Sequence, residues 1–351
     1  MPPSCPLVRP IVTRIAGTTE GRQATTEKPE RSAPTAMNPP DDTKTEIAFP
    51  TTNFERGVRL DLLQQVGEDS GYFEALGDSH WAVFNEDGST LVISFDRLED
   101  IQALEPGKMP DVFGQATQNG WSHLSLISEG DTWYRDKAVF AYMDRLVDAC
   151  FFDEYDQVVF YGTGMGAYAA TAFSVTAPGC TVLAVQPRAT LSPEMAIWET
   201  RYRDARRLNF TDRYGYAPDM TEGTKKVFTL HDPYNSLDAM HVALFRKPYV
   251  TPLKAPFIGE NIGKSLAEMG ILSKLLKAAC EGKLTETLYN RLWRERRSNG
   301  NYLRWIMRAC ADAGHPQREA MICRSVINRI RAPGFRNHLA RLEKSGVLDK
   351  T

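Results

Sequence analysis

Residues 158–175, VVFYGTGMGAYAATAFSV, join a β-branched and aromatic run to a glycine-rich turn and then to a run of small residues, with no charged side chain. Two kinds of chemistry use a turn of this composition between a strand and a helix. A dinucleotide site needs glycines so that a pyrophosphate can approach the backbone at a helix N-terminus. A nucleophile elbow, G-x-S-x-G, holds an attacking side chain on a strained turn between two small residues. The third alternative is an elbow that has lost its nucleophile.

The dinucleotide alternative rests on Gly162–Ala167, which satisfies the pattern G-x-G-x-x-A. That pattern also requires an acidic residue about 20 positions later to hold the ribose. The next strand end instead carries Gln186, Pro187 and Arg188, of which only Arg188 could face a 2′-phosphate. At least three strands precede the turn, whereas this fingerprint usually opens its fold. Nucleotide binding is therefore the weaker alternative.

The elbow alternative fits in everything except the nucleophile. Gly162 and Gly166 occupy the two flanking positions, where small residues let the helix pack closely on neighbouring strands. The central position is Gly164, which has no side chain to attack a substrate and tolerates the unusual backbone angles without strain. Thr163 and Met165 point elsewhere in such a turn, and we treat both, together with Gly162, as candidate ligand-binding residues.

The remaining positions of a catalytic triad can be placed by chain order, which runs nucleophile, acid, histidine in this type of fold. Asp232 follows the second strand beyond the elbow, and Asp238 is a second candidate acid. The histidine position falls in Gly259-Glu260-Asn261, so Glu260 stands where the base is expected, and none of the six histidines lies in that loop. Gly164, Asp232 and Glu260 are thus predicted to be vestigial triad positions.

Trp133, Arg135 and Arg188 are predicted to border a cleft above the strand ends, where they would clamp an anion or a sugar. The plain alternative is that these arginines are solvated surface residues. The six cysteines form no C-x-x-C pair and have no histidine at ligand spacing, so neither a metal site nor a disulfide framework is indicated. We expect buried free thiols, no metal and no cofactor.

The elements around this turn alternate between strands and helices. Amphipathic helical stretches separate the apolar strands from the third strand onward, which predicts an α/β fold with a mostly parallel, doubly wound sheet. The predicted strands are WAVF, TLVISF, HLSLIS, QVVFYG, TVLAVQ, KVFTLHD and VTPLKAP. Ligands of such sheets bind at the carboxyl ends of the strands.

Composition divides the chain into three predicted parts. Residues 1–50 contain nine prolines and no apolar period, so we expect a disordered extension, with Met37 as an alternative start. Residues 51–272 form the α/β domain. Residues 273–351 read as five short helices and carry 17 Lys and Arg against 7 Asp and Glu, which predicts a basic helical module.

The chain resembles bacterial α/β-hydrolase-like proteins of alphaproteobacteria that lack the elbow serine. The resemblance rests on GWSHLSLISEGDTWYRD, QVVFYGTGMGAYAATAFS, VLAVQPRATL and TDRYGYAPDM, and it extends over about 300 residues. Members of this group are often labelled phosphoadenosine phosphosulfate reductase. The chain has neither the S-G-G-x-D-S loop nor the E-C-G-x-H motif of such reductases, so we do not expect reductase activity.

These observations predict a degenerate α/β-hydrolase-fold protein that acts by binding a small ligand or a protein partner. The alternatives are an active hydrolase or transferase with a non-standard site and a nucleotide-binding protein. In RLWRERRSNGNYLRWIMR the aromatic residues follow helical spacing together with leucines, which favours packing over nucleic-acid contact. We therefore expect no nucleic acid partner, no membrane segment and a cytoplasmic location. Docking of the basic tail on the acidic body, within one chain or between copies in a homo-oligomer, stays open.

Overall fold

A computed structural model of the chain describes residues 63–65, 67–68, 70–104 and 110–349. The predicted disorder of residues 1–50 lies outside the described residues. So do the predicted start of the α/β domain at residue 51 and the question of Met37.

Within this described part, eight strands form one sheet in the order β1-β2-β4-β3-β5-β6-β7-β8. β1 pairs with β2 and β2 with β4 in antiparallel fashion, and every later pair is parallel. The strands are Gly71–Ala75 (β1), His80–Asn85 (β2), Thr90–Arg97 (β3), Ser122–Ser128 (β4), Gln157–Thr163 (β5), Thr181–Val185 (β6), Lys226–His231 (β7) and Val250–Lys254 (β8). The prediction of an α/β fold with a mostly parallel sheet is confirmed.

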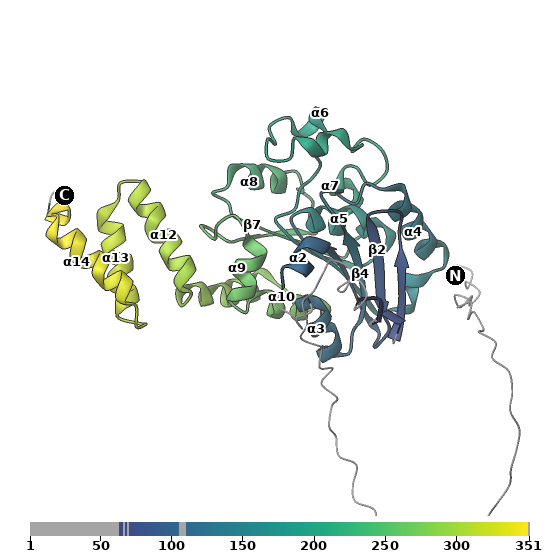
Figure 1. Ribbon diagram of the computed structural model, residues 1–351, viewed down its shortest axis with the longest axis horizontal. Coiled ribbons are helices and arrows are strands. Elements are labelled where there is room, and N and C mark those ends of the chain that lie inside the picture. Colours follow the sequence, from purple (N-terminus) through teal and green to yellow (C-terminus); the bar gives the residue numbers. More distant parts are fainter. Residues whose placement is uncertain (1–62, 66, 69, 105–109, 350–351) are drawn as a thin grey trace, which may run out of the picture. The chain divides into compact units, whose positions relative to one another are not determined.

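Helices connect and cover these strands (Figure 1). Their bounds are Leu98–Gln102 (α2), Asp111–Asn119 (α3), Lys137–Asp148 (α4), Met165–Phe173 (α5), Pro193–Ala196 (α6), Ala217–Met220 (α7), Ser236–Ala243 (α8), Ile262–Glu268 (α9), Leu272–Cys280 (α10), Glu286–Leu292 (α11), Gly300–Asp312 (α12), Pro316–Ile327 (α13) and Pro333–Lys344 (α14). Short 3-10 helices occupy Phe151–Glu154, Ser174–Thr176, Asp204–Arg207, Trp293–Arg297 and Val347–Asp349. No helix of the described residues is long and apolar enough to cross a membrane.

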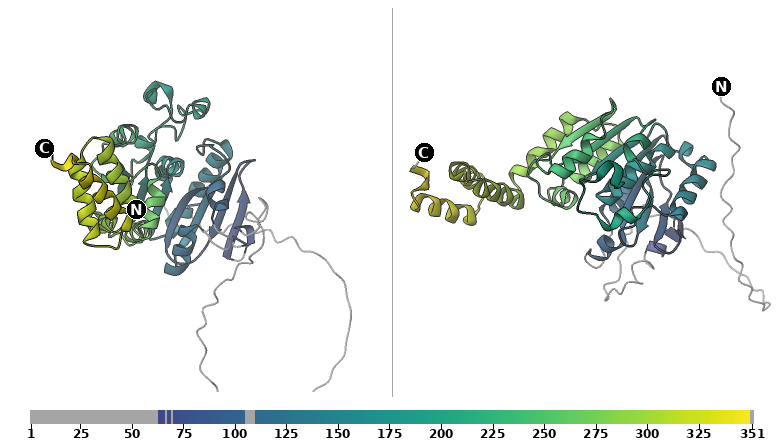
Figure 2. Two further views of the ribbon diagram at one scale, coloured as in Figure 1. Left: turned by 60° about the vertical axis from the view of Figure 1, so that its left-hand side comes forward. Right: turned by 90° about the horizontal axis from the view of Figure 1, so that it is seen from above.

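The alternation of side chains along each strand divides the core into two layers, with helices on both faces of the sheet in Figure 2. Val158 and Phe160 of β5 belong to the cluster that includes residues of α4 and α5. Val159 and Tyr161 face the opposite way and belong to the cluster built with α9, α10 and α11. Because both faces of β5 are buried, its sequence reads as a continuous apolar run.

The five helical patterns predicted after residue 270 are present as α10 to α14, which confirms a helical C-terminal set. Its first members belong to the core of the sheet, because Leu275 and Leu276 of α10 are buried in the same cluster as Val159 and Leu183. The predicted boundary at residue 272 therefore falls inside one continuous apolar layer.

Candidate functional site

Gly164 lies at the turn between β5 and α5 with φ 55° and ψ −113°. This combination is open to glycine and costly for any residue with a Cβ atom. The amide of Gly164 donates to the carbonyl of Val185 at 2.9 Å, which fixes the turn against the end of β6. A Cβ built on Gly164 would meet no heavy atom within 4 Å, so the position faces open space. The strand-to-helix turn predicted as an elbow thus has backbone angles that would strain a residue with a Cβ atom, and it presents no side chain there.

The two flanking glycines are required by close backbone packing. A Cβ on Gly162 would lie 2.2 Å from the carbonyl oxygen of Gly166, and a Cβ on Gly166 would lie 2.2 Å from the carbonyl oxygen of Phe95. Both distances are far inside van der Waals contact with atoms that cannot turn away. These glycines let α5 pack on β5 and β3, and packing alone accounts for them without a phosphate.

Asp232, the predicted acid, follows the last residue of β7 and is buried. Its Oδ1 accepts a hydrogen bond from the amide of Tyr234 at 2.9 Å, and its Oδ2 accepts one from the amide of Ile258 at 3.2 Å. The carboxylate therefore ties the turn after β7 to the loop after β8. Both of its oxygens are engaged by backbone amides.

Glu260, in the predicted base position, is exposed, and its side chain makes no hydrogen bond or ion pair with any described residue. The next residue, Asn261, is the N-cap of α9, and its Oδ1 accepts from the amide of Lys264 at 3.0 Å. Within the described part of the chain, no hydrogen bond or ion pair joins Gly164, Asp232 and Glu260.

Thr163 and Met165 flank Gly164 and have different surroundings. Thr163 is exposed, and a Cβ on Gly263 of α9 would lie 3.0 Å from its methyl carbon, so Thr163 sits close to α9. Met165 is buried, and its sulfur accepts from the amide of Trp133 at 3.1 Å.

Trp133 is buried at a positive φ of 54°. Its ring makes edge contacts with Tyr168, Tyr202 and Phe210 at centroid distances of 5.8, 5.0 and 6.4 Å. The indole Nε1 is buried without a hydrogen-bond partner among the described residues. An unpaired N–H in such an aromatic setting is the one feature of Trp133 that could serve a ligand.

The guanidinium of Arg135 holds the segment that precedes α7. Its Nε donates to the carbonyl of Asn209 at 2.8 Å, one terminal nitrogen donates to the carbonyl of Arg213 at 2.9 Å, and the group forms an ion pair with Asp212. Its side chain is 1% exposed. The prediction that Arg135 binds an anion stays a prediction, and these contacts give it an internal role.

Arg188 belongs to a buried charge network beyond the end of β6. It forms an ion pair with Asp238 at 3.3 Å and donates to the hydroxyl of Tyr202 at 3.0 Å, while its Nε has no partner in the described part of the chain. Arg201 binds Asp238 at 2.7 Å and Glu199 at 2.6 Å. Burial alone would raise the pKa of Asp238, but Arg188, together with a hydrogen bond from Gln186, lowers it. Asp238 is therefore a charged structural partner here.

His241 completes this network as a neutral side chain. Its Nδ1 lies 3.2 Å from the amide of Ala189 and accepts from it, so the proton is assigned to Nε2, which donates to Glu199 at 3.1 Å. Burial lowers the pKa of His241, against the opposing effect of the Glu199 carboxylate. The histidine is occupied on both sides and cannot serve the elbow.

Gln186 joins this network to the triad loops, which the sequence did not indicate. It has a positive φ of 56° directly after β6. Its Nε2 donates to Asp238 at 2.9 Å, and its Oε1 accepts from the amide of Ile262 at 3.3 Å. One amide side chain thus links the first turns of α8 and α9. The only sign of this role in the sequence is that a polar, non-glycine residue follows the strand directly.

Comparisons with solved structures return proteins of similar chain arrangement at low identity. The capsule O-acetyltransferase of Neisseria meningitidis serogroup A shows 11% identity over 60% of this chain and 94% of its own, with a TM-score of 0.40. Est1E from Butyrivibrio proteoclasticus shows 13% identity over 62% and 98%, with a TM-score of 0.38. A fluorophosphonate-binding serine hydrolase of Staphylococcus aureus shows 8% identity over 57% and 91%, with a TM-score of 0.38. No protein-family model matches the chain, and no curated protein matches its sequence.

Proposed function

We propose that this chain is a non-catalytic binding protein built on a sheet of α/β-hydrolase type. The observation that carries the proposal is Gly164, which occupies the elbow turn with the strained backbone geometry and open space of a nucleophile position but has no side chain. A glycine at this point removes covalent catalysis, because no atom is present to attack a carbonyl carbon.

The surroundings of the turn support the same conclusion. Asp232 is engaged by backbone amides, Glu260 is exposed without a partner in the described part of the chain, and His241 is bound by Ala189 and Glu199. Triad enzymes stripped of their catalytic side chains retain only about 10³- to 10⁴-fold acceleration over water. A site of this kind would hold a small ligand or a protein partner without turning it over.

The nucleotide alternative receives less support. Gly162 and Gly166 are needed for backbone packing, and Gln186 at the next strand end is bound to Asp238 and Ile262. The acidic side chain at this strand end, Asp238, is already paired with Arg188 and Arg201. We expect NAD, NADP and phosphoadenosine phosphosulfate to show no saturable binding tighter than about 0.1 mM, roughly −5.5 kcal/mol.

The experiment that tests the proposal is labelling of the purified protein with a fluorophosphonate probe, combined with hydrolysis assays on short acyl esters. We expect neither labelling nor turnover above the buffer rate.

The matched variant is Gly164→Cys, which places a thiol in the open space at the turn. Its selective modification by a maleimide, located by mass spectrometry, would show that the inactive turn is accessible.

Stoichiometric labelling of any residue of the unmodified protein by the fluorophosphonate would overturn the proposal and establish an active hydrolase or transferase with a non-standard site. Ester turnover that survives in Gly164→Cys after maleimide modification would place that active site away from the elbow.

A further inference from the structure

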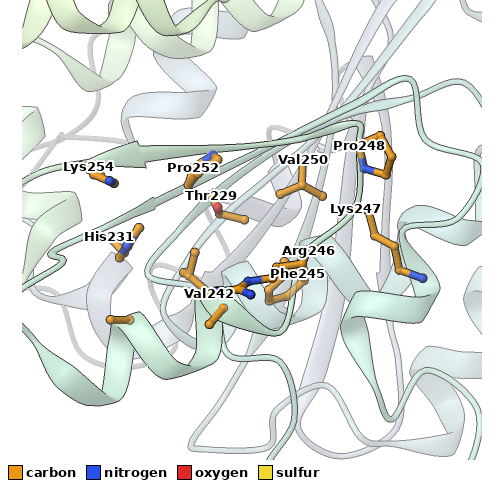
Figure 3. Close-up of a pocket in the computed structure, with 12 residues that line it drawn as sticks. Thr229, His231, Val242, Phe245, Arg246, Lys247, Pro248, Val250, Pro252 and Lys254 are labelled. Carbon is orange, nitrogen blue, oxygen red and sulfur yellow. The ribbon is translucent and has the colours of Figure 1, made fainter.

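A groove of about 570 Å³ lies along β7 and the edge strand β8 and is bordered by α8 and the turn that follows it (Figure 3). Its lining residues are Thr229, His231, Ala239, Val242, Ala243, Phe245, Arg246, Lys247, Pro248, Val250, Pro252 and Lys254. The volume is in the range of small-molecule sites. The groove lies on a face of the sheet, whereas the elbow lies at the strand ends.

The pairing of β7 with β8 explains why these side chains come together. Thr229 is in register with Pro252, and His231 with Lys254. Because side chains alternate along a strand, all four point to the same face of the sheet. In Figure 3 the strand residues lie opposite Val242, Phe245 and Arg246.

One buried polar atom in this groove, the hydroxyl of Thr229, has no hydrogen-bond partner among the described residues. The Thr229 side chain is 0% exposed. A buried polar group without a partner destabilises the fold and is uncommon in native proteins, so this hydroxyl indicates a missing ligand.

The charged residues of the groove are all cationic. Lys247 is paired with Glu222 at 3.2 Å, but neither Arg246 nor the ammonium of Lys254 forms an ion pair with a described residue. Two carboxylates act on His231: Asp238, which Arg188 and Arg201 neutralise, and Asp232, whose oxygens accept from backbone amides. With Arg246 and Lys254 both unpaired among the described residues, the groove has an excess of positive charge.

His231 is a neutral side chain in the wall of this groove. Burial lowers the pKa of its imidazole, against the opposing effects of a hydrogen bond to the Thr229 carbonyl and of Asp238, while Lys254 lowers it further and Asp232 raises it. A neutral imidazole has one proton to donate, and here that proton serves the Thr229 carbonyl.

We propose that this groove binds an amphipathic carboxylate, an organic anion with an apolar chain or ring. Its carboxylate is held by Lys254 or Arg246 together with the hydroxyl of Thr229. Its apolar part lies on the wall formed by Val242, Ala243, Phe245, Val250 and Pro252.

An added β-strand from a peptide or a second copy fits this edge poorly. The amides of Val227 and Ala255 bond across β7 and β8, so the backbone N–H and C=O groups of residues 250, 252 and 254 face the open edge of the sheet. The amide of Val250 is taken by the carbonyl of Lys247 at 3.1 Å, and Pro252 has no amide hydrogen. Too few donors remain for a strand ladder.

The test is isothermal titration of the full chain with decanoate below its micelle concentration, with decanol and octyl phosphate as comparison ligands. We expect saturable binding of decanoate, at least about tenfold weaker binding of decanol, and weaker binding of octyl phosphate. Binding of decanol as tight as that of decanoate would overturn the electrostatic part of the proposal. Binding of octyl phosphate without binding of decanoate would overturn the assignment of a carboxylate, and no saturable binding of any of the three would overturn the site.

Variants locate the binding. Thr229→Val keeps the shape and removes the unpaired hydroxyl, so we expect the free protein to unfold at a higher temperature while the affinity for decanoate falls about tenfold. Arg246→Gln and Lys254→Gln should each lower the affinity for decanoate and leave the affinity for decanol unchanged. The matched control is Lys226→Gln, at the start of β7 on the opposite face, and it should bind decanoate as the unmodified protein does.

In Thr229→Val, a higher melting temperature together with weaker decanoate binding separates a ligand contact from a structural one. A lower melting temperature in this variant would show that the hydroxyl is satisfied in the free protein and would remove the basis of the proposal. An effect of Lys226→Gln equal to that of Arg246→Gln and Lys254→Gln would reduce the interaction to general electrostatics. Because the groove is separate from the turn at Gly164, decanoate binding tests this site independently of the fluorophosphonate experiment.

Discussion

Gly164 shows how one residue can separate the shape of a site from its chemistry. The turn that presents it is held by the hydrogen bond from the Gly164 amide to the carbonyl of Val185 and by the packing of Gly162 and Gly166, and neither depends on a nucleophile. The turn is therefore stable without a side chain at position 164. The glycine also removes the backbone strain that any other residue would carry at φ 55°.

The first prediction concerns that strain. Gly164→Ala meets no steric clash, so its cost is that of holding a residue with a Cβ at positive φ, about 1 to 3 kcal/mol of unfolding free energy. The matched control is Gly114→Ala in α3, where the added methyl is also unhindered and the helical backbone favours alanine by about 1 kcal/mol. Urea denaturation should therefore show opposite signs for the two variants, and a stabilised Gly164→Ala would contradict the strained geometry.

The second prediction follows from buried histidines. Burial lowers the pKa of His123 to about 3, and burial likewise lowers the pKa values of His80, His231 and His241. Below pH 6.5 the unfolded chain therefore binds more protons at these positions than the native chain does. Stability is therefore complete above pH 6.5 and falls as the pH is lowered, by up to about 1.4 kcal/mol per histidine and pH unit.

His123→Gln tests this slope, because the glutamine amide can still donate to Ser94 as the His123 ring does at 2.9 Å. Burial raises the pKa of Asp96, which acts in the opposite sense, so the comparison of variant and unmodified protein isolates the histidine. Urea titrations between pH 7 and pH 5 should show a shallower loss of stability in the variant. Equal slopes would mean that His123 is not buried as a neutral ring.

At the scale of elements, the sequence predicted β2 to β8 and the helices α10 to α14, because their apolar periods and glycine or proline ends are local signals. It missed β1, whose five residues are mostly half-exposed and form the antiparallel edge of the sheet. The elbow was predictable because its glycines lie within five positions. The network of Arg188, Asp238 and His241 was not predictable, because its members lie about 50 positions apart and share no local pattern.

The third prediction tests the fit of α5 on the sheet. Gly162→Ala and Gly166→Ala each place a methyl 2.2 Å from a carbonyl oxygen, of Gly166 and Phe95 respectively. The backbones must separate, and overpacking of this kind costs about 1 to 3 kcal/mol or more. Both variants should lose more stability in urea than Gly164→Ala, which has strain without a clash. The reverse ranking would show that α5 can move away from β5 at little cost.

At the scale of the whole molecule, the two apolar layers end in different ways. The layer on the α5 side stops short at β7 and β8, where it leaves the groove beside α8. The opposite layer continues from β5 through α10 and on to Trp293 and Tyr302. The hydroxyl of Tyr302 donates to the carbonyl of Pro256 at 3.2 Å, which anchors α12 to the loop after β8.

The last prediction follows from that continuity and concerns two shortened chains. A chain that ends at Gly270 loses Leu275, Leu276 and Ala279, which are at most 1% exposed and cover β5 and β6 on one face. Each buried leucine is worth about 2 to 5 kcal/mol on the scale of leucine-to-alanine losses, so the remaining chain should fail to unfold cooperatively.

A chain that ends at Ala313 keeps α10, α11 and α12 and removes α13 and α14. In these two helices the side chains with 0% exposure are Cys323 and Val326. It should stay folded with a lower melting temperature. Circular dichroism during heating distinguishes the two, and a cooperative transition in the chain that ends at Gly270 would show that the α/β domain is complete at the boundary predicted from composition.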